Sequence, residues 1–448
     1  MRIIVAGAGA GKTTSMAQKV LDRFKEVTNG KIIYVITYTN AARDRIREKI
    51  IELNGAIPKQ LLIETSHAFL LREVIFPFHH LLYEEQYTIV SQIKLPDNSG
   101  FKAMKIRELQ KKKIIHVEKV TETAKWIISG KSRDTKAIKD KRKKILLIIQ
   151  RYLDSVFIDE AQDMDDHLVK IIEVLDNMGI KLNLVGDPKQ DLRGRNDFSE
   201  LIEKFKEHVE YKTENYRCPI SHVNLANVYI SEEEKQIPKT LEVGQISYVF
   251  ESDTDVVNFI KDSKLNQVFI YKKNERFTTQ PEDQNKTEQN LSHELQSLVK
   301  KSGFKESEIN QAVYMLKKEV LKEIQKSTNS AIFKKLEELL SIKLTKIDMG
   351  KLGEALKMYR DNRVNSGILV QTIDKVKGLE GEICLFILTT DLAPYLFVEK
   401  VEKNKMLNYL YVALTRAKKE LRILVTQEVE EKYGRQPIKE KFQTLLKK

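Results

Sequence analysis

A glycine-rich segment near the start of the chain has the residue types needed to hold phosphate. It reads Ala6-Gly7-Ala8-Gly9-Ala10-Gly11-Lys12-Thr13-Thr14 and stands between an apolar run and a segment of helical periodicity. Glycines let the backbone approach a phosphate closely, and the N–H groups at the start of a helix then point at it. Lys12 would neutralise the β- and γ-phosphates, and the Thr13 hydroxyl would bind Mg²⁺. The segment therefore predicts a nucleotide-binding loop, in a variant that opens with Ala6 in place of glycine.

Two adjacent carboxylates follow a later apolar run, in the sequence VFIDEAQD. Because the carboxyl ends of parallel strands meet at one edge of a sheet, Asp159 and Glu160 are expected beside the glycine-rich loop. Asp159 would bind Mg²⁺, and Glu160 would accept a proton from an attacking water molecule. The two motifs together predict a hydrolase of ATP, or of another nucleoside triphosphate, with Mg²⁺ as its cofactor.

The segments that must position these residues alternate between strand-like and helix-like patterns, which predicts parallel sheets covered by helices. Strands are expected in the first half at 2–6, 31–37, 60–66, 154–160 and 181–187. Strands are expected in the second half at 245–251, 267–274, 367–373, 382–390 and 421–427. The predicted fold class is α/β, with two parallel-sheet domains that are each interrupted by a helical insertion.

The domain boundaries follow from this alternation. The first sheet domain is predicted at 1–66 and 151–217, and its basic helical insertion, without strand alternation, at 67–150. The second sheet domain is predicted at 218–274 and 366–448, with a shorter helical insertion at 275–365.

Positive charge is concentrated in the first insertion. The chain of 448 residues has a net charge of +13. Residues 101–151 contain 13 Lys and 4 Arg against 5 acidic residues, an excess of 13 + 4 − 5 = 12. A basic stripe of this kind is typical of a protein that binds the phosphate backbone of a nucleic acid, although it can also be a solvated helical surface or face an acidic partner.

Composition excludes several other classes of protein. A hydrophobic fraction of 41% is typical of a folded chain. No apolar run approaches the about 18–20 residues of a membrane helix, and Met1 leads directly into a strand rather than a signal peptide. The two cysteines, Cys218 and Cys384, lack the spacing of a zinc site, so a chain without a disulfide framework in the reducing cytoplasm is expected.

Eight motifs in order carry a family resemblance: AGAGAGKTT, YTNAARDRIREKI, ETSHAF, FIDEAQD, LVGDPKQ, NYRCP, QTIDKVKGLEG and LYVALTRAKKEL. This set resembles the UvrD/Rep/PcrA-like branch of superfamily-one DNA helicases, whose fold has two RecA-like domains. The segment ETSHAFLLREVIFPFHHLL and the reduced second insertion further resemble the helicase-like subunit of Gabija anti-phage defence systems.

The resemblance implies roles for residues in both sheet domains. Gln190 would sense the γ-phosphate, and Arg217 and Arg416 would act as arginine fingers. Tyr216 would stack on the base, and Glu380 would accept a hydrogen bond from the ribose. Residues at family positions that contact single-stranded DNA are Thr37, Tyr38, Asn40, Thr65, His67 and Thr372.

Less specific roles remain open for some of these residues. Tyr216 could be a core residue, Arg217 and Arg416 surface charges, and Glu380 an exposed acid at the start of a strand. His67 is more often structural than functional. His79 and His80 are expected on a helix surface, without a metal.

The chain departs from the family pattern in four places. Only five residues precede Ala6, where the family carries a glutamine segment that selects adenine, so other nucleoside triphosphates are expected to serve. Asp191-Leu192-Arg193-Gly194 follows Gln190 directly, without the usual aromatic stretch. Asp374 stands where the family has His, and the second insertion is short.

Three functions fit this pattern. The first is a DNA-stimulated motor, acting on single-stranded or partly single-stranded DNA with an OLD-family nuclease as its partner in a hetero-oligomeric defence complex. The second is a nucleotide-gated subunit that docks onto its partner without unwinding DNA. The third is a stand-alone repair or phage helicase, against which the short second insertion argues.

Overall fold

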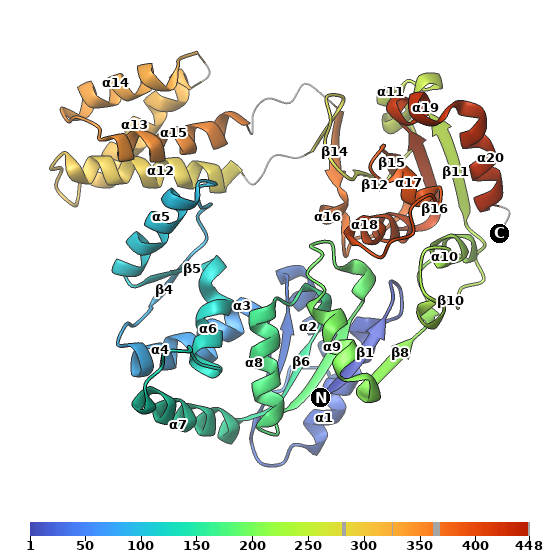
Figure 1. The fold of residues 1–448 in the computed structure, drawn as a ribbon, viewed down its shortest axis with the longest axis horizontal. Helices are drawn as coiled ribbons and strands as arrows, with labels where there is room; N and C mark the ends of the chain where they lie inside the picture. The colour runs from blue at the N-terminus through green and yellow to red at the C-terminus, as the bar shows by residue number, and fades with distance from the viewer. Residues whose placement is uncertain (280–283, 325, 362–367, 447–448) are drawn as a thin grey trace. The chain divides into compact units, whose positions relative to one another are not determined.

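Figure 1 shows the computed structural model, which describes residues 1–279, 284–324, 326–361 and 368–446. The chain divides into two compact units. Unit 1 joins residues 1–85, 120–277 and 368–448, and it contains both large sheets. Unit 2 joins residues 86–119 and 278–367 and is mainly helical.

The first sheet of unit 1 has six strands in the order β3-β2-β6-β7-β1-β8, and all of its pairs are parallel. The strands are β1 (Arg2–Ala6), β2 (Ile32–Thr37), β3 (Leu61–Thr65), β6 (Leu153–Ile158), β7 (Lys181–Gly186) and β8 (Val209–Lys212). The helices that connect them are α1 (Lys12–Glu26), α2 (Asn40–Asn54), α8 (Asp166–Asn177) and α9 (Asp197–Lys204). The apolar run of β2 is almost wholly buried, as expected for a strand covered on both faces.

The second sheet of unit 1 also has six strands, in the order β11-β16-β15-β12-β14-β13. They are β11 (Gln245–Phe250), β12 (Gln267–Ile270), β13 (Phe277–Thr279), β14 (Ile368–Thr372), β15 (Gly381–Leu388) and β16 (Ala417–Val425). Its helices are α10 (Ile220–Asn227), α11 (Val256–Asp262), α16 (Ile373–Val376), α17 (Ala393–Leu396), α18 (Lys405–Leu414), α19 (Gln427–Tyr433) and α20 (Arg435–Leu446). The predicted fold class, α/β with two parallel-sheet domains, is confirmed.

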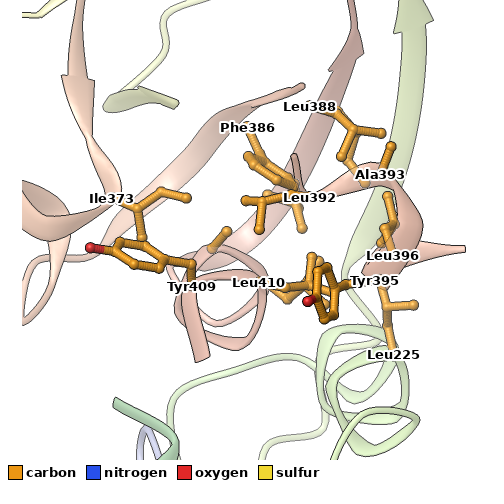
Figure 2. Packing of buried hydrophobic residues seen from close by; sticks show 14 of the residues in the cluster. Leu225, Ile373, Phe386, Leu388, Leu392, Ala393, Tyr395, Leu396, Tyr409 and Leu410 are labelled. Carbon is orange, nitrogen blue, oxygen red and sulfur yellow. The ribbon is translucent and has the colours of Figure 1, made fainter. Parts of the chain in front are cut away.

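Each sheet has its own apolar core. In the first, Met16 and Val20 of α1 and Ile46 of α2 pack on Ile33 and Val35 of β2. These helical positions are four residues apart on α1 and therefore face the same way. Figure 2 shows part of the second core, where residues of β15, α16, α17, α18 and α10 meet. In both sheets, the packing of apolar helix faces on the strands fixes the strand ends that carry the residues of the candidate site.

The first insertion contributes to both units. The helices α3 (Ser66–Leu70), α4 (Phe76–Tyr83), α6 (Val120–Ile128) and α7 (Lys136–Tyr152) belong to unit 1. The helix α5 (Ser99–Lys111) and the strands β4 (Ile89–Ser91) and β5 (Ile114–His116) belong to unit 2. The segment 67–150 is thus mainly helical, and its two strands have only three residues each, which is too short to produce strand alternation in the sequence.

Unit 2 has a helical core of its own. The helices α12 (Gln284–Lys301), α13 (Ile309–Glu323), α14 (Asn329–Leu340) and α15 (Lys346–Asp361) bury a shared leucine-rich cluster that includes Leu295, Leu316, Leu336 and Leu356. The second insertion is thus largely helical where it is described, as predicted, and its residues 280–283, 325 and 362–365 lie outside the described residues. The boundaries drawn from the sequence remain a prediction.

One histidine outside the sheets lies in an unexpected place. His79 was expected on a helix surface, but it is only 4% exposed and its Nδ1 lies 2.6 Å from the carbonyl oxygen of Glu85. His79 shares a buried face of α4 with Leu82 and lies against the Tyr83 ring, at a centroid distance of 5.2 Å, whereas Leu81 is exposed. Within the described part of the chain, no helix has the length and apolar composition that crossing a membrane requires.

Candidate nucleotide site and cleft

The glycine-rich loop joins β1 to α1, as the sequence predicts. Gly9 and Gly11 have φ angles of 76° and 68°, in the left-handed region that favours glycine. The helix α1 begins at Lys12, so the free N–H groups of its first turn face the loop. The Lys12 ammonium donates to the carbonyls of Ala6 and Gly7, at 3.2 and 3.3 Å. A charge held over the loop in this way can neutralise a bound phosphate.

The carboxylate pair follows β6 directly, at the edge of the sheet where β1 ends. Glu160 adopts a left-handed φ of 54°, and its N–H donates to Asp159 Oδ1 at 3.0 Å. Its own side chain accepts from Gln162 Nε2 at 2.6 Å. Burial, together with the charge of Glu160, raises the pKa of Asp159 to about 7. The pair therefore holds negative charge in a buried place, a cost that a bound cation would offset.

The residues at this position fit Mg²⁺. Asp159 is 4% exposed and has no ion pair among the residues that the structure describes. Thr13 lies in the first turn of α1 and offers a hydroxyl oxygen. Carboxylate and hydroxyl oxygens are ligands that Mg²⁺ prefers. Asp159 and Thr13 are therefore suited to hold the metal together with nucleotide phosphates.

The turn that carries Gln190 is fixed by a third buried carboxylate, Asp187. Its side chain accepts from Gln190 Nε2 at 2.9 Å and forms an ion pair with Lys189 at 3.0 Å. Burial alone would raise the pKa of Asp187, but Lys189 and Lys12 lower it below its ordinary value. Asp187 thus stays charged and orients the amide of Gln190. The sequence motif GDPKQ contained this residue, but the prediction passed over it.

Arg416 is buried without a carboxylate partner. Its side chain is 1% exposed. The guanidinium donates to the carbonyls of Val412 and Leu379 and to the Thr415 hydroxyl, at 2.9, 3.2 and 3.0 Å. No carboxylate among the described residues pairs with it. Because a buried charge without a counter-ion is costly, this geometry suits a site that receives an anion, and the alternative that Arg416 is a surface charge is wrong.

The other predicted arginine is already paired. Arg217 Nε lies 2.6 Å from Glu380 Oε2, and Lys418 Nζ lies 2.6 Å from Glu380 Oε1. Burial would raise the pKa of Glu380, but Lys418 and Arg217 hold it below its ordinary value. The structure therefore joins two residues that the sequence had assigned separately, one to the γ-phosphate and one to the ribose.

Tyr216 is placed beside the glycine-rich loop. Its N–H donates to the carbonyl of Gly9 at 2.9 Å, and its side chain is 65% exposed. The alternative that Tyr216 is a core residue is therefore wrong. An exposed ring next to the loop is available to stack on a base.

A network that the sequence did not predict also contacts the loop. The Ala8 N–H donates to the Tyr411 hydroxyl at 3.0 Å. The side-chain amides of Asn215 and Gln236 donate to the Ala8 carbonyl, each at 2.9 Å. Asn215 and Tyr411 stand inside the motifs NYRCP and LYVALTRAKKEL, whereas no pattern marks Gln236. Both backbone groups of Ala8 are thus held by side chains that lie far away in the sequence.

A cavity of about 520 Å³ opens within unit 1 and is called the cleft here. Its lining includes Glu160 of the carboxylate pair, so the cleft and the candidate nucleotide site meet. Basic and acidic side chains both line it: Arg45, Arg193, Arg195, Lys375, Lys377, Glu160, Asp163, Asp165 and Asp374. The ion pair between Lys377 and Asp163, at 2.6 Å, joins segments that follow β14 and β6.

The residues predicted to contact DNA fall into two groups. Tyr38 and His67 line the cleft. Thr37 is fully buried and its hydroxyl donates to the Thr39 carbonyl. Asn40, Thr65 and Thr372 stand at the starts of helices or the ends of strands and are not part of the cleft lining. For all six residues, contact with DNA stays a prediction.

Arg193 was not predicted, although it also lines the cleft. Its side chain is exposed and has no hydrogen bond or ion pair among the described residues, because the bonds of this turn use backbone N–H groups. The sequence signal that could have identified Arg193 was its place in the segment that follows Gln190 directly. An unpaired guanidinium in a cleft is suited to contact a phosphate.

The basic stripe at 101–151 does not lie in one unit. Residues 101–119 belong to unit 2 and residues 120–151 to unit 1. On α7 the side chains of Lys139, Lys141, Lys143 and Lys144 are exposed. Arg142 is buried, where it pairs with Asp134 and donates to the Ile127 carbonyl. These four lysines, like the exposed Lys136 of the same helix but unlike Arg142, can therefore contact a partner.

Comparisons with known proteins show what the chain is similar to. A family model described as an AAA domain matches residues 1–194, which include the glycine-rich loop, both carboxylates and Gln190. The chain is 30% identical over 262 residues to Gabija protein GajB of Bacillus cereus (strain VD045). That match covers 54% of this chain and 49% of the relative, so the chain spans about half of that protein's length. The resemblance to the helicase-like Gabija subunit is thus confirmed.

Among solved structures, the chain is similar to the nonstructural protein 10 of an arterivirus, a helicase, in a complex with DNA. The match covers 94% of this chain and 59% of that chain, with 10% sequence identity and a TM-score of 0.37. A similarity this low carries no argument about the site.

Proposed function

We propose that the chain hydrolyses nucleoside triphosphates with Mg²⁺ and that single-stranded DNA in the cleft stimulates hydrolysis. The observation that carries the proposal is the buried guanidinium of Arg416. It lies beyond the end of the helix α18, whose Tyr411 contacts the glycine-rich loop. A nucleotide on that loop would bring the phosphate charge that the guanidinium lacks.

The residues of the site would divide the chemistry among them. Lys12 and the N–H groups at the start of α1 would hold the β- and γ-phosphates, while Asp159 and Thr13 would hold Mg²⁺, which neutralises phosphate charge. Glu160 would take the proton of the attacking water. The new bond joins the water oxygen to the γ-phosphorus, and the bond to the β-phosphate oxygen breaks.

Stabilisation of the transition state would come from the second sheet domain. Arg416 is preorganised by three hydrogen bonds, so it needs little reorganisation when charge develops on the transferred phosphoryl group. Arg217 would have to leave Glu380 to reach the same group. We therefore assign the larger share of this role to Arg416 and propose that Glu380 receives the ribose hydroxyl once Arg217 has left.

The cleft supports DNA as the second ligand. Tyr38, His67 and the unpaired Arg193 line it, and rings and guanidinium groups are the side chains that stack on bases and contact phosphates. The similarity to a Gabija protein supports a role in anti-phage defence. In that role we propose a complex with an OLD-family nuclease subunit.

A specific observation favours the alternative in which the chain is a nucleotide-gated subunit that does not unwind DNA. Among the described residues, Tyr38 supplies the only Phe, Tyr or Trp ring in the cleft lining. Base stacking contributes about 1–3 kcal/mol per base, so a cleft with one such ring would bind the bases weakly.

The deciding experiment measures hydrolysis of each of the four nucleoside triphosphates by the purified chain, with and without single-stranded DNA. Strong stimulation by DNA is the expected result, and an unwinding assay on a tailed duplex would follow. Turnover that ignores DNA would favour the nucleotide-gated subunit. Absence of both hydrolysis and nucleotide binding would overturn the proposed function.

A further inference from the structure

The helix α18 contacts two loops of the first sheet domain through one of its faces. The Asn408 side-chain amide donates to the carbonyls of Asp191 and Pro188, at 2.9 and 3.4 Å. These carbonyls flank Gln190. Three residues later, the Tyr411 hydroxyl accepts from the Ala8 N–H of the glycine-rich loop. Residues three apart share a helix face, so one face of α18 contacts both loops that would surround a bound nucleotide.

A second face of the same helix reaches the cleft. Tyr409 lies between Asn408 and Tyr411 in the sequence but about 100° around the helix from Asn408. Its hydroxyl donates to both carboxylate oxygens of Asp374, at 2.9 and 3.0 Å. Asp374 lies in the short helix α16 and lines the cleft. One rigid helix therefore contacts the nucleotide loops and the cleft wall.

The ring of Tyr409 is held firmly. It is 8% exposed, it packs edge-on against Tyr271 at a centroid distance of 4.8 Å, and Figure 2 shows it beside Ile373. The hydroxyl is thus aimed at Asp374 by packing on both sides. Asp374 stands where the resembled family has histidine, and its carboxylate would repel DNA phosphates. The bond to Tyr409 sets where that negative charge lies in the cleft.

We propose that the hydrogen bond between Tyr409 and Asp374 couples the nucleotide site to the cleft, with Tyr409 as the positioning residue. A nucleotide on the glycine-rich loop displaces or strengthens the contacts of Ala8 and of the Gln190 turn with α18. The helix moves as a unit, and Tyr409 carries Asp374 and α16 with it. The carboxylate then moves relative to the DNA phosphates, so each ligand changes the affinity of the chain for the other.

The test measures this reciprocity directly, and it rests on the proposed function because it requires both ligands. The affinity for a non-hydrolysable ATP analogue is measured with and without an oligothymidylate, in the unaltered chain, in Tyr409→Phe and in Tyr229→Phe. Tyr229 is a matched control, since it is 9% exposed in the same core and its hydroxyl donates to the Leu396 carbonyl, away from both ligands.

In the unaltered chain, DNA should change the analogue affinity by about 5- to 150-fold, the usual range of coupling between two sites. In Tyr409→Phe this ratio should fall close to 1, while in Tyr229→Phe it should equal that of the unaltered chain. Asp374→Ala, which changes an exposed residue, should give the same loss. The double variant should lose no more than either single variant, because both changes remove one interaction.

The outcomes separate the two proposals. If the unaltered chain binds neither the analogue nor DNA, the proposed function fails. If both ligands bind but the ratio in Tyr409→Phe and Asp374→Ala equals that of the unaltered chain, the coupling through this bond is overturned and the proposed function stands. If both ligands bind the unaltered chain without affecting each other, the coupling is likewise overturned. Equal thermal unfolding of Tyr409→Phe and Tyr229→Phe excludes a general loss of structure as the cause.

Discussion

In the first sheet domain, Lys12 and Asp159 have no ionic partner among the residues that the structure describes, and their side chains contact backbone groups. In the second sheet domain, Glu380 pairs with Lys418 and with Arg217, the last residue of the first domain as predicted from the sequence. Arg416 is the exception in the second domain, since its guanidinium contacts carbonyls and a hydroxyl. Asp187 and Lys189 of the first domain do form an ion pair, which fixes the Gln190 turn, so the contrast between the domains concerns the groups expected to contact the nucleotide and its metal.

This difference suggests a division of labour. Groups without an ionic partner can bind phosphate or metal without first breaking a strong contact, so the first domain is suited to capture the nucleotide. Paired groups must exchange partners before they can act, so the second domain is suited to control when hydrolysis occurs. Arg416 is ready to act in the same way as the groups of the first domain. Hydrogen bonds hold its guanidinium in place, and no carboxylate among the described residues pairs with it.

The largest effect is expected from Lys12→Ala in the first domain. The substitution removes the ammonium above the loop, and turnover should fall about 10³-fold or more, because both phosphate binding and stabilisation of transition-state charge are lost. The measurement is phosphate release under saturating nucleotide, with thermal unfolding as the control for folding. Turnover near that of the unaltered chain would contradict the capture role of the first domain.

Arg416→Lys tests the second domain with the charge preserved. A lysine cannot reproduce the planar fork of three hydrogen bonds, so turnover should fall about 10²- to 10³-fold. Nucleotide affinity should change less than about threefold, because the group acts on charge that develops in the transition state. The two quantities come from steady-state kinetics and from equilibrium titration of an analogue. An equal loss of affinity and turnover would place Arg416 in ground-state binding.

The elements around these residues were largely predictable from the sequence. The glycine-rich loop and the carboxylate pair follow apolar runs that fold as buried strands, and both patterns are local. The contacts of Ala8 with Tyr411 and Gln236 were not predictable, because residues hundreds of positions apart meet through packing of the two sheets. The partner of Arg217 was hidden for the same reason, although Glu380 itself stood in a recognised motif.

A third prediction concerns acid stability near the second sheet domain. His222 of α10 is fully buried, and this burial lowers its pKa to about 4 from 6.5. Below pH 6.5 the unfolded chain therefore binds a proton at His222, whereas the folded chain binds it only near pH 4. The free energy of unfolding falls as the pH decreases from 6.5 to about 4. The loss should total about 3 kcal/mol for a shift of this size.

Urea unfolding at pH 7.5 and pH 4.5 measures this loss. His222→Phe removes the titrating ring and should abolish its share of the pH dependence, because the buried Nε2 has no hydrogen-bond partner among the described residues. His208, which lies in an exposed turn after α9, provides a control substitution to Phe that should leave the pH dependence in place. Equal pH dependence in His222→Phe and the unaltered chain would show that another group is responsible.

Glu380→Gln tests whether partner exchange limits the second domain. The substitution frees Arg217 from its ion pair, so the arginine should reach the phosphates more easily while the ribose contact weakens. The KM for a nucleoside triphosphate should rise about tenfold, as for loss of a hydrogen bond to a charged group, with little change for the 2′-deoxy substrate. The KM values measured separately for the nucleoside triphosphate and its 2′-deoxy form check this. A parallel rise for both would contradict the ribose contact.

The smallest effect is expected on α7, where exposed lysines extend the first domain's capture role to DNA. Replacing Lys139, Lys141, Lys143 and Lys144 by Gln should weaken binding of single-stranded DNA. It should also reduce the slope of log affinity against log salt by about 0.7 for each phosphate that the variant no longer neutralises. Arg142 stays unchanged as the matched residue of the same helix, because its charge is buried against Asp134. A slope equal to that of the unaltered chain would mean that these lysines face an acidic protein surface instead. In that case the first domain would capture the nucleotide alone, and DNA would be held by the cleft, where Arg193, which has no partner among the described residues, is the cation to change next.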